Sequence, residues 1–439
     1  MATLVPQVGH NLVDVGVSGL IGCLPDRYAW NLRIIPYGLD VKLRPMIEDK
    51  YSVYLHIPFC VHRCAYCDFN TYAGLEELIP AYVQALVKEI QYLSQSAPRR
   101  LPVHSFFFGG GTPSLVPLNQ LQKIFESLDE CFDWLPETEI TLEANPGTIS
   151  LAYLQGIRQL GVNRLSLGMQ SANPGELRIL ERQHGLKDVI QAVSWARQAG
   201  IGNLNLDLIF GLPYQSLESW GNTLNMALSL QPDHLALYAL TLEHGTPMAH
   251  WVERGLISQP DDDLAADMYD RAGELLERAR FEQYEISNWA RRDSMNQLMA
   301  CQHNLQYWRF GPFLGIGAGS HGYLPGMRTV DTLAPASYIQ RLAQLTGPLP
   351  YPRTPATVEV RRLTQEEEMS EMMIMGLRLV QEGIAEMDFK RRFGRTPDDI
   401  YGSAILRLER LGLLERHAQA LRLTRKGYLL GNQVFREFV

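Results

Sequence analysis

The feature that most constrains the fold is an alternation of short apolar runs with longer helical stretches, which begins near residue 51. Runs of β-branched or aromatic residues followed by helical spacing are typical of βα units in a parallel sheet. Because a closed barrel of this kind needs eight strands, six units predict an α/β fold built on a partial, open (β/α)6 barrel. The predicted strands are Ser52–His56, Val103–Phe108, Glu139–Glu143, Asn163–Leu167, Asn203–Leu208 and His234–Ala239.

Polar and glycine residues gather where these predicted strands end. Gly109-Gly-Gly-Thr-Pro113 follows the second strand, Glu143 ends the third, and Gln170 follows the fourth. Asp207 lies in the fifth. Parallel barrels build their active sites at the carboxyl ends of the strands, so we predict a site there. The alternative is that the glycines only form a tight turn and that the carboxylates only cap the following helices.

Three of the six cysteines lie in one loop that follows the first predicted strand. Cys60, Cys64 and Cys67 form a C-x3-C-x2-C run. Three thiolates can hold three irons of a [4Fe–4S] cube and leave the fourth iron open for chemistry. A structural zinc site usually needs four ligands, which His56 or His62 could complete, so zinc is the alternative. We predict the [4Fe–4S] cluster.

Composition excludes several other classes of protein. The chain has 439 residues, 46% of them hydrophobic, which is enough for one large α/β domain and a smaller one. A formal net charge of -8 gives no electrostatic footprint for nucleic acid. No apolar run reaches the roughly 18 residues that span a bilayer. The run ending at Cys23 resembles a lipobox, but no Lys or Arg precedes it and Asp14 interrupts it. We expect a cytoplasmic protein, with peripheral membrane association left open.

The cysteine loop resembles the signature of the radical S-adenosylmethionine (SAM) enzymes. Further motifs, among them Tyr54-x-His-Ile-Pro-Phe-Cys60, Glu143-Ala-Asn-Pro and Leu180-Glu-Arg-Gln-His184, resemble the anaerobic coproporphyrinogen III oxidase family over residues 50 to 439. The resemblance implies that SAM binds the open iron and that an electron donor reduces the cluster. The residues it implies as SAM contacts are Tyr54, Tyr66, Gly110, Gly111, Thr112, Glu143, Gln170, Arg182 and Asp207.

Two markers separate the branches of that family. The oxidases carry a fourth cysteine two places after the third, where this chain has Phe69. The sequence His303-Asn304-x-x-Tyr307-Trp308 matches the heme-binding motif of the heme chaperone (HemW-type) branch, which implies heme, client hemoproteins and, as an open question, a homodimer. An imidazole can bind heme iron and the two aromatic rings can cover a macrocycle. The alternatives are an oxidase, a radical SAM enzyme on another substrate, or a structural His303 with a core aromatic pair.

The chain is predicted to divide into four parts. Residues 1–49 form an N-terminal extension of open role, and Met46 is a second candidate start. Residues 50–290 form the barrel, 291–355 a connecting region, and 356–439 a helical, winged-helix-like domain that covers the barrel mouth or docks a client. Its methionine-rich helix, Glu366–Gln381, is expected to use its methionines as core and not as heme ligands. The glycine-rich Gly311–Gly322 is interpreted as a close-packed loop near the SAM site.

Overall fold

The computed structural model describes residues 50–344, 347 and 349–439. The expectations for the N-terminal extension, including Met46 and Cys23, lie outside the described residues. Within them, all six predicted strands are confirmed; their ends lie within a few residues of those expected, except that β5 begins at Phe132 and not at Glu139. They are β1 (Tyr51–Ile57), β4 (Leu101–Gly110), β5 (Phe132–Ala144), β6 (Arg164–Gln170), β7 (Asn203–Phe210) and β8 (His234–Ala239).

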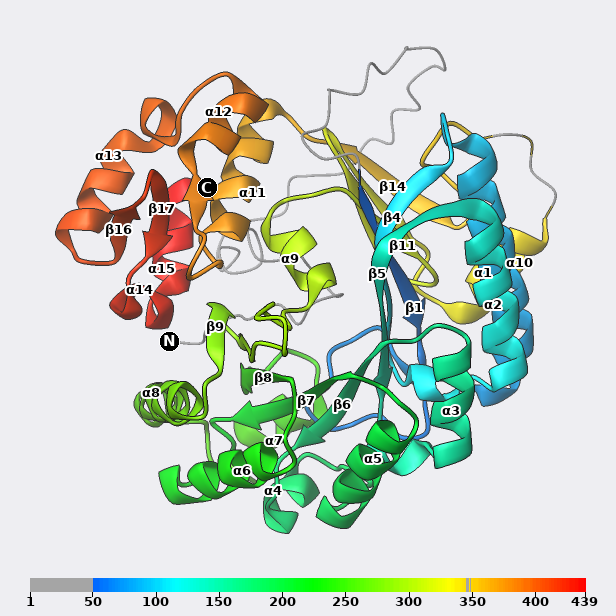
Figure 1. Cartoon of the computed structure of the whole chain (residues 1–439), viewed down its shortest axis with the longest axis horizontal. Coiled ribbons are helices and arrows are strands. Elements are labelled where there is room, and N and C mark those ends of the chain that lie inside the picture. Colours follow the sequence, from blue (N-terminus) through cyan, green and yellow to red (C-terminus); the bar gives the residue numbers. More distant parts are fainter. Residues whose placement is uncertain (1–49, 345–346, 348) are drawn as a thin grey trace.

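These six strands are parallel neighbours in the order of the sequence. They curve into an open barrel in which β1 and β8 do not pair with each other, as predicted (Figure 1). Parallel neighbours put all six carboxyl ends at one edge of the sheet. The register also fixes which residues share a level, because Glu143 pairs with Ser166 and Asp207 pairs with Ala236.

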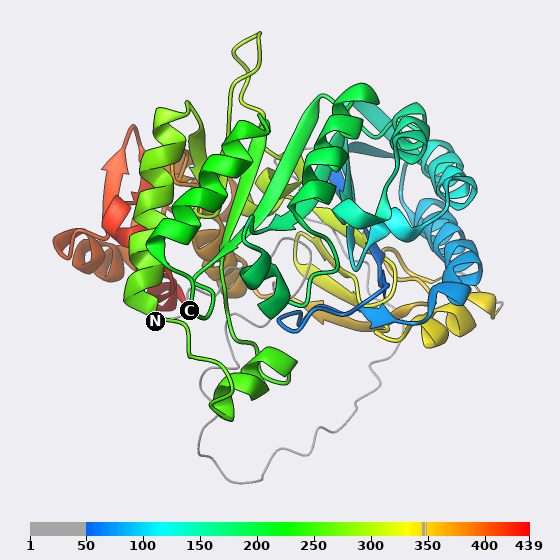
Figure 2. The ribbon, with the colours of Figure 1, turned by 90° about the horizontal axis from the view of Figure 1, so that it is seen from below.

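Helices cover the outer face of the barrel, and Figure 2 shows them outside the curved sheet. Their buried sides pack on strand residues in one large core that includes Leu55, Phe108 and Leu206. Local signals set where they begin: Ser216 caps one helix by accepting a hydrogen bond from the backbone N–H of Ser219. The principal outer helices are α1 (Ile79–Ser96), α2 (Leu118–Cys131), α3 (Leu151–Gln159), α5 (Leu186–Gln198), α6 (Leu217–Ser229) and α8 (Asp262–Arg278); α4 (Pro174–Ile179) and α7 (Pro247–Glu253) are short.

The sheet continues beyond the predicted strands at both sides. β11 (Phe313–Ile316) lies parallel beside β1, and three antiparallel pairings join it to β12 (His321–Leu324), β13 (Met327–Asp331) and β14 (Thr357–Arg362). At the other side β10 (Asn288–Ala290) and β9 (Glu282–Glu285) follow β8. The sheet therefore includes much of the region that was expected to be a connection.

The glycine-rich Gly311–Gly322 forms β11, a turn and β12. It is close-packed, since a Cβ added to Gly315 would collide with the backbone of His321. A Cβ on Gly317 would lie 2.7 Å from the carbonyl oxygen of His56, so this turn packs against β1, the strand that leads into the cysteine loop. It contributes no residue to the wall of the pocket described below.

The C-terminal residues form helices around a small three-stranded sheet, with a core of their own. The methionines at 369, 372, 373 and 375 are all buried in that core, which confirms their structural role. α10 (Pro335–Ala343) packs on the barrel beside α1. The C-terminal elements are α11 (Gln365–Gly376), β15 (Ile384–Ala385), α12 (Glu386–Phe393), α13 (Pro397–Arg410), β16 (Leu414–His417), β17 (Ala420–Leu423), α14 (Arg425–Leu429) and α15 (Gly431–Phe435). The domain boundaries at residues 49, 290 and 355 stay predictions.

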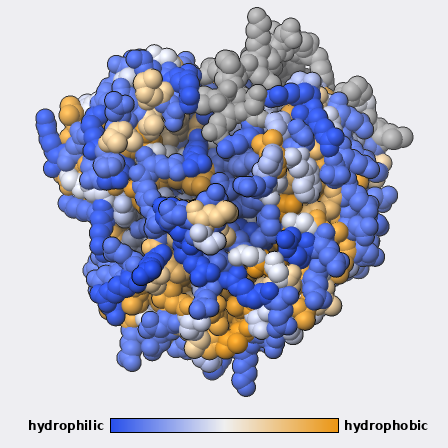
Figure 3. Space-filling view, in the orientation of Figure 1, coloured by the Kyte–Doolittle hydropathy of each residue, from blue (hydrophilic) through white to orange (hydrophobic). Residues whose placement is uncertain are grey.

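The face seen in Figure 3 is largely hydrophilic, with hydrophobic residues scattered at its lower and right margins. In the part of the chain that the structure describes, no helix combines the length and apolar character needed to cross a bilayer.

Candidate functional site

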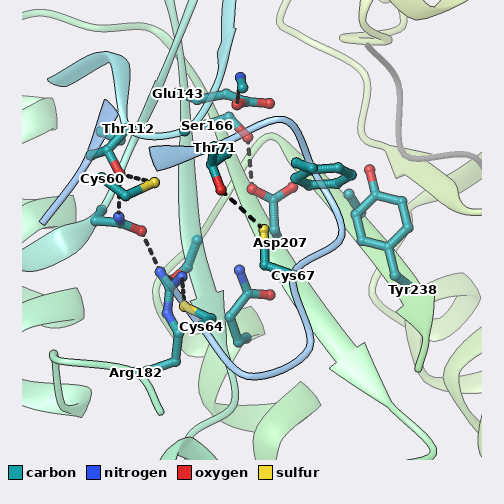
Figure 4. Close-up of a pocket in the computed structure, with 18 of the residues that line it drawn as sticks. Cys60, Cys64, Cys67, Thr71, Thr112, Glu143, Ser166, Arg182, Asp207 and Tyr238 are labelled. Atoms are coloured by element: carbon teal, nitrogen blue, oxygen red, sulfur yellow. Dashed lines mark hydrogen bonds between the residues drawn. The ribbon is translucent and has the colours of Figure 1, made fainter. Parts of the chain in front are cut away.

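A pocket opens at the carboxyl ends of the parallel strands. Its empty space measures about 1070 Å³ when the open solvent at its mouth is included. Figure 4 shows cysteine, acidic and arginine side chains facing this one hollow from different strands and loops. The predicted site residues that line it are Cys60, Cys64, Cys67, Tyr66, Gly110, Gly111, Thr112, Glu143, Gln170, Arg182 and Asp207.

The three cysteines of the loop are free thiols on the wall of this pocket. Each sulfur has a hydrogen-bonding group nearby: Thr112 Oγ1 lies 3.7 Å from Cys60, Arg182 Nη1 lies 3.5 Å from Cys64, and Thr71 Oγ1 lies 3.8 Å from Cys67. Burial raises the pKa of the Cys60 thiol to about 11. Metal binding must therefore displace its proton, and donors beside a sulfur stabilise the thiolate that results.

The histidines considered as further zinc ligands are engaged elsewhere. His56 is fully buried, and its Nε2 lies 2.9 Å from the carbonyl oxygen of Asn70, while its Nδ1 lies 3.1 Å from the Tyr54 hydroxyl. His62 Nε2 lies 3.3 Å from a carboxylate oxygen of Glu181. Among the described side chains, no three His, Cys, Asp or Glu residues converge on a point that suits one metal ion. The donors in the pocket are thus three separate thiols, which is the set that a cubane with one open iron requires.

The glycines after β4 let the strand end pass close to the cysteine loop. A Cβ on Gly111 would lie 2.6 Å from the carbonyl oxygen of Phe59 and 3.0 Å from Cys60 Sγ. Gly110 has a φ of +116°, which side chains rarely adopt, and its Cβ would meet the His56 ring at 2.5 Å. Both positions need glycine, and together they leave a backbone edge without side chains beside the thiols.

Glu143 stands at the end of β5, next to this glycine edge. Its Oε2 accepts a hydrogen bond of 3.1 Å from the backbone N–H of Gly110. Burial and the nearby carboxylate of Asp207 raise the pKa of Glu143 to about 8, although Gly110 and Arg164 oppose the shift. At neutral pH the carboxyl group is therefore mostly protonated in the free pocket.

This pKa predicts that a cationic ligand such as SAM binds more tightly as the pH rises from about 6.5 to 8.5. Glu143 ionises over that interval and its negative charge then attracts the ligand, so binding below pH 8 should release a proton. Calorimetric titration in two buffers of different ionisation enthalpy measures that release. The Glu143→Gln variant should show neither the release nor the pH dependence. Equal pH dependence in the variant would assign the titration to another group.

Arg182 joins the cysteine loop to the barrel wall. Besides Cys64, its guanidinium contacts the carbonyl oxygen of Gly168 at 3.0 Å and the side-chain oxygen of Asn145. The amide of Asn145 in turn donates to Thr112 Oγ1 at 2.9 Å. This chain of contacts holds the loop in register with two strand ends. Asn145 was not among the predicted site residues.

Polar side chains on β6 and β7 line the deeper wall. Ser166 and Asn205 donate to the two oxygens of Asp207 at 2.9 and 2.8 Å. Sequence reasoning missed Arg164, Ser166 and Asn205. The signal was present, because polar residues occupy every second position of these buried strands, which places them on the one face that looks into the barrel.

Tyr54 does not reach the pocket. It lies in β1 behind the glycine edge, where it is buried and its ring lies 6.2 Å from that of Phe107. A Cβ on Gly109 would lie 3.0 Å from the Tyr54 ring and 3.2 Å from Glu143 Oε2. The tyrosine therefore packs beside Gly109, close to Glu143.

The H-N-x-x-Y-W motif forms α9 (Gln302–Trp308), which lies against the inner side of the barrel. His303 is fully buried; its Nδ1 lies 3.0 Å from Ser105 Oγ and its Nε2 lies 3.0 Å from the Tyr307 hydroxyl. Trp308 is buried under the guanidinium of Arg378, 4.5 Å from its ring centre. None of the three predicted heme contacts lines the pocket, whereas their neighbour Asn304 does.

Comparisons with known proteins agree with this geometry. A family model described as the radical SAM superfamily matches residues 54–227, and one described as the HemN C-terminal domain matches residues 363–430. The chain is 35% identical over 390 residues to the heme chaperone HemW of Bacillus subtilis, covering 88% of this chain and 99% of that protein. It is 36% identical to the heme chaperone HemW of Synechocystis over 335 residues, covering 75% of this chain and 78% of that one. The solved coproporphyrinogen III oxidase (HemN) of Escherichia coli, a radical SAM enzyme, superposes with a TM-score of 0.74 at 22% identity over 89% of this chain and 90% of that one, which confirms the fold.

Proposed function

This chain belongs to the heme chaperone HemW family within the radical SAM superfamily, and from that membership we propose that it binds heme and transfers it to apoproteins. The observation that carries the proposal is the likeness to the HemW proteins over nearly their whole length. The pocket supports it, because Phe69 occupies its wall two places after Cys67. The oxidase alternative would carry a fourth thiol at that position.

We infer that Cys60, Cys64 and Cys67 hold a [4Fe–4S] cluster and that SAM binds beside it. When bound, these groups supply an electron and a 5′-deoxyadenosyl radical. The pocket residues would bind and orient the ligand: the Gly110–Thr112 edge would receive its methionine amino group, and Glu143 and Asp207 would attract its positive charges. Arg182 would hold the cysteine loop through Cys64 and exclude water from one side of the site.

The heme site proposed at His303 requires α9 to change its contacts. Burial lowers the pKa of His303 well below its usual range, so the ring is neutral, which is the form that binds iron. Both ring nitrogens are already hydrogen-bonded, however, to Ser105 and Tyr307. We infer that heme binding exchanges one of these bonds for iron. Client hemoproteins, an electron donor and a homodimer belong to the same proposal. So does a cytoplasmic location, which suits the free thiols of the five cysteines that the structure describes.

An anaerobic heme titration followed at the Soret band tests this site. Saturable binding to the wild type should be lost in His303→Ala. That variant also removes two buried hydrogen bonds, so Ser105→Ala is the matched control, since it disturbs the same network and leaves the imidazole in place. We expect Ser105→Ala to bind heme as tightly as the wild type or a few-fold more tightly, because the bond to Nδ1 no longer competes. Equal heme affinity in His303→Ala and the wild type would remove His303 from the site.

A further inference from the structure

The inner end of the pocket contains a buried arginine whose guanidinium forms no salt bridge within the described part of the chain. Arg164 is 2% exposed and lines the pocket, and its Nε has no hydrogen-bond partner among the described residues. It stands two positions before Ser166 on β6, paired with Thr141 and Asn203, and so lies deeper than the level of Glu143. A buried guanidinium is always charged and is costly to leave unpaired.

The three carboxylates near Arg164 accept hydrogen bonds from other donors, and Glu143 accepts its bond from the backbone N–H of Gly110. Glu139 accepts hydrogen bonds from the backbone N–H groups of Gln302 and His303 at 3.0 and 3.1 Å, and lies 3.3 Å from the Cys301 thiol. Asp207 accepts its bonds from Ser166 and Asn205. These acids add favourable charge at a distance, but none of the three is hydrogen-bonded to the guanidinium. The N–H groups of the Arg164 guanidinium are therefore available to a ligand in the pocket.

Two amide side chains that line the same pocket also have an atom without a hydrogen-bond partner among the described residues. Asn288 on β10 and Asn304 on α9 both line the pocket, and the side-chain oxygen of each is buried without a partner among the described residues. They are 1% and 5% exposed. The NH₂ group of Asn288 already donates to a carboxylate oxygen of Glu285, so its oxygen can accept a hydrogen bond from a ligand, whereas the NH₂ group of Asn304 can donate one. Three buried polar groups from three separate elements thus line the same pocket.

We propose that Arg164, Asn288 and Asn304 form a subsite for a carboxylate group of a small molecule at the inner end of the pocket. A guanidinium binds a carboxylate through two parallel hydrogen bonds, and the amides fit the remaining oxygen lone pairs or a donor beside them. A singly charged group suits the position better than a phosphate, because Glu139 and Asp207 stand close by. Resting on the proposed function, the carboxylate comes either from a propionate of the heme or from the methionine end of SAM.

The test compares each acid with its counterpart that lacks the carboxylate. Heme and heme dimethyl ester are titrated into the wild type and into Arg164→Gln, and SAM and decarboxylated SAM are titrated in the same way. The subsite predicts that Arg164→Gln weakens binding of one acid at least tenfold and leaves its counterpart unchanged, with partial recovery in Arg164→Lys. The exposed Arg271→Gln on α8 is the control and should match the wild type. The acid that responds identifies the source.

Several outcomes would overturn the subsite. Equal losses for an acid and its counterpart, or no loss for either acid, would leave Arg164 a structural residue. If Arg164→Gln does not fold, Arg164→Lys takes its place and must weaken binding of one acid while leaving its counterpart unchanged. The proposed function can fail separately from the subsite. If heme binds tightly but its affinity depends neither on Arg164 nor on the propionates, the chaperone function stands and the heme subsite is refuted. If heme does not bind but SAM binding depends on Arg164, the subsite stands and the chaperone function is refuted.

Discussion

Replacing Cys64 with alanine is expected to lower the iron content of the anaerobically reconstituted protein from about four irons per chain to almost none. Cys60, Cys64 and Cys67 are the cysteines of the described chain that line the pocket, so the cluster has no substitute ligand there. The loss should also release Arg182, which contacts Cys64 at 3.5 Å. Iron and sulfide analysis together with the visible absorption of the cluster measures the effect.

Cys131→Ala is the matched control for that experiment. Cys131 is a free, buried cysteine at the end of α2, in the main core and away from the pocket. Its replacement should leave the iron content unchanged and cost only packing energy. A Cys64→Ala protein that retains four irons, or a Cys131→Ala protein that loses them, would contradict the ligand assignment.

Replacing Glu89 with alanine is expected to destabilise the barrel by roughly 3–5 kcal/mol. Glu89 is fully buried in α1 and accepts hydrogen bonds from Thr354 Oγ1 at 2.6 Å, Tyr338 Oη at 2.5 Å and the backbone N–H of Gly317 at 2.9 Å. Alanine would leave these three buried donors without an acceptor. Because Gly317 packs against His56, the damage should reach the strand that leads into the cysteine loop. Thermal unfolding followed by circular dichroism gives the size of the loss.

Two further variants separate this network from general surface effects. Glu126→Ala, an exposed glutamate on α2, should change stability by less than about 0.5 kcal/mol. Glu89→Gln keeps an acceptor and should cost less than alanine. Burial raises the pKa of Glu89 above its ordinary value, so the fold favours the protonated acid. Its stabilising contribution is complete at low pH and falls as pH rises through the folded pKa, and Glu89→Gln should reduce that fall. A Glu89→Ala melting curve identical to the wild type would refute the network's role.

The local sequence was enough to predict the six central strands of the sheet, but not the strands at its two sides. The six inner strands are buried on both faces, so they read as apolar runs bounded by turns; Val103–Phe108 falls inside β4. β9 to β14 were missed because they are short strands outside the repeated βα units, and only β9 and β14 lie at the edges of the sheet. β11 lies in a glycine-rich stretch with no strand period, and only its parallel pairing with β1 makes it a strand.

The site was predictable where a motif fixes spacing and less so where the fold brings distant residues together. The cysteines, Gly110, Glu143 and Asp207 could be placed because strand ends of a parallel barrel meet. Arg164 carried a weaker signal, a charge within an apolar strand. Asn304 belongs to the motif of α9, but nothing in the sequence placed it in the pocket, and Asn288 carried no signal, since β10 and α9 reach the pocket only through tertiary packing.

Transfer of heme is the most direct test of the proposed function. The reconstituted protein is loaded with one equivalent of heme, separated from free heme, and mixed anaerobically with an excess of an apo-hemoprotein, and the acceptor's Soret spectrum is followed with time. We predict saturable loading and transfer to the acceptor that is faster from the loaded protein than from the same amount of heme on serum albumin. Failure to retain heme, or an acceptor that fills no faster than from albumin, would contradict the chaperone account.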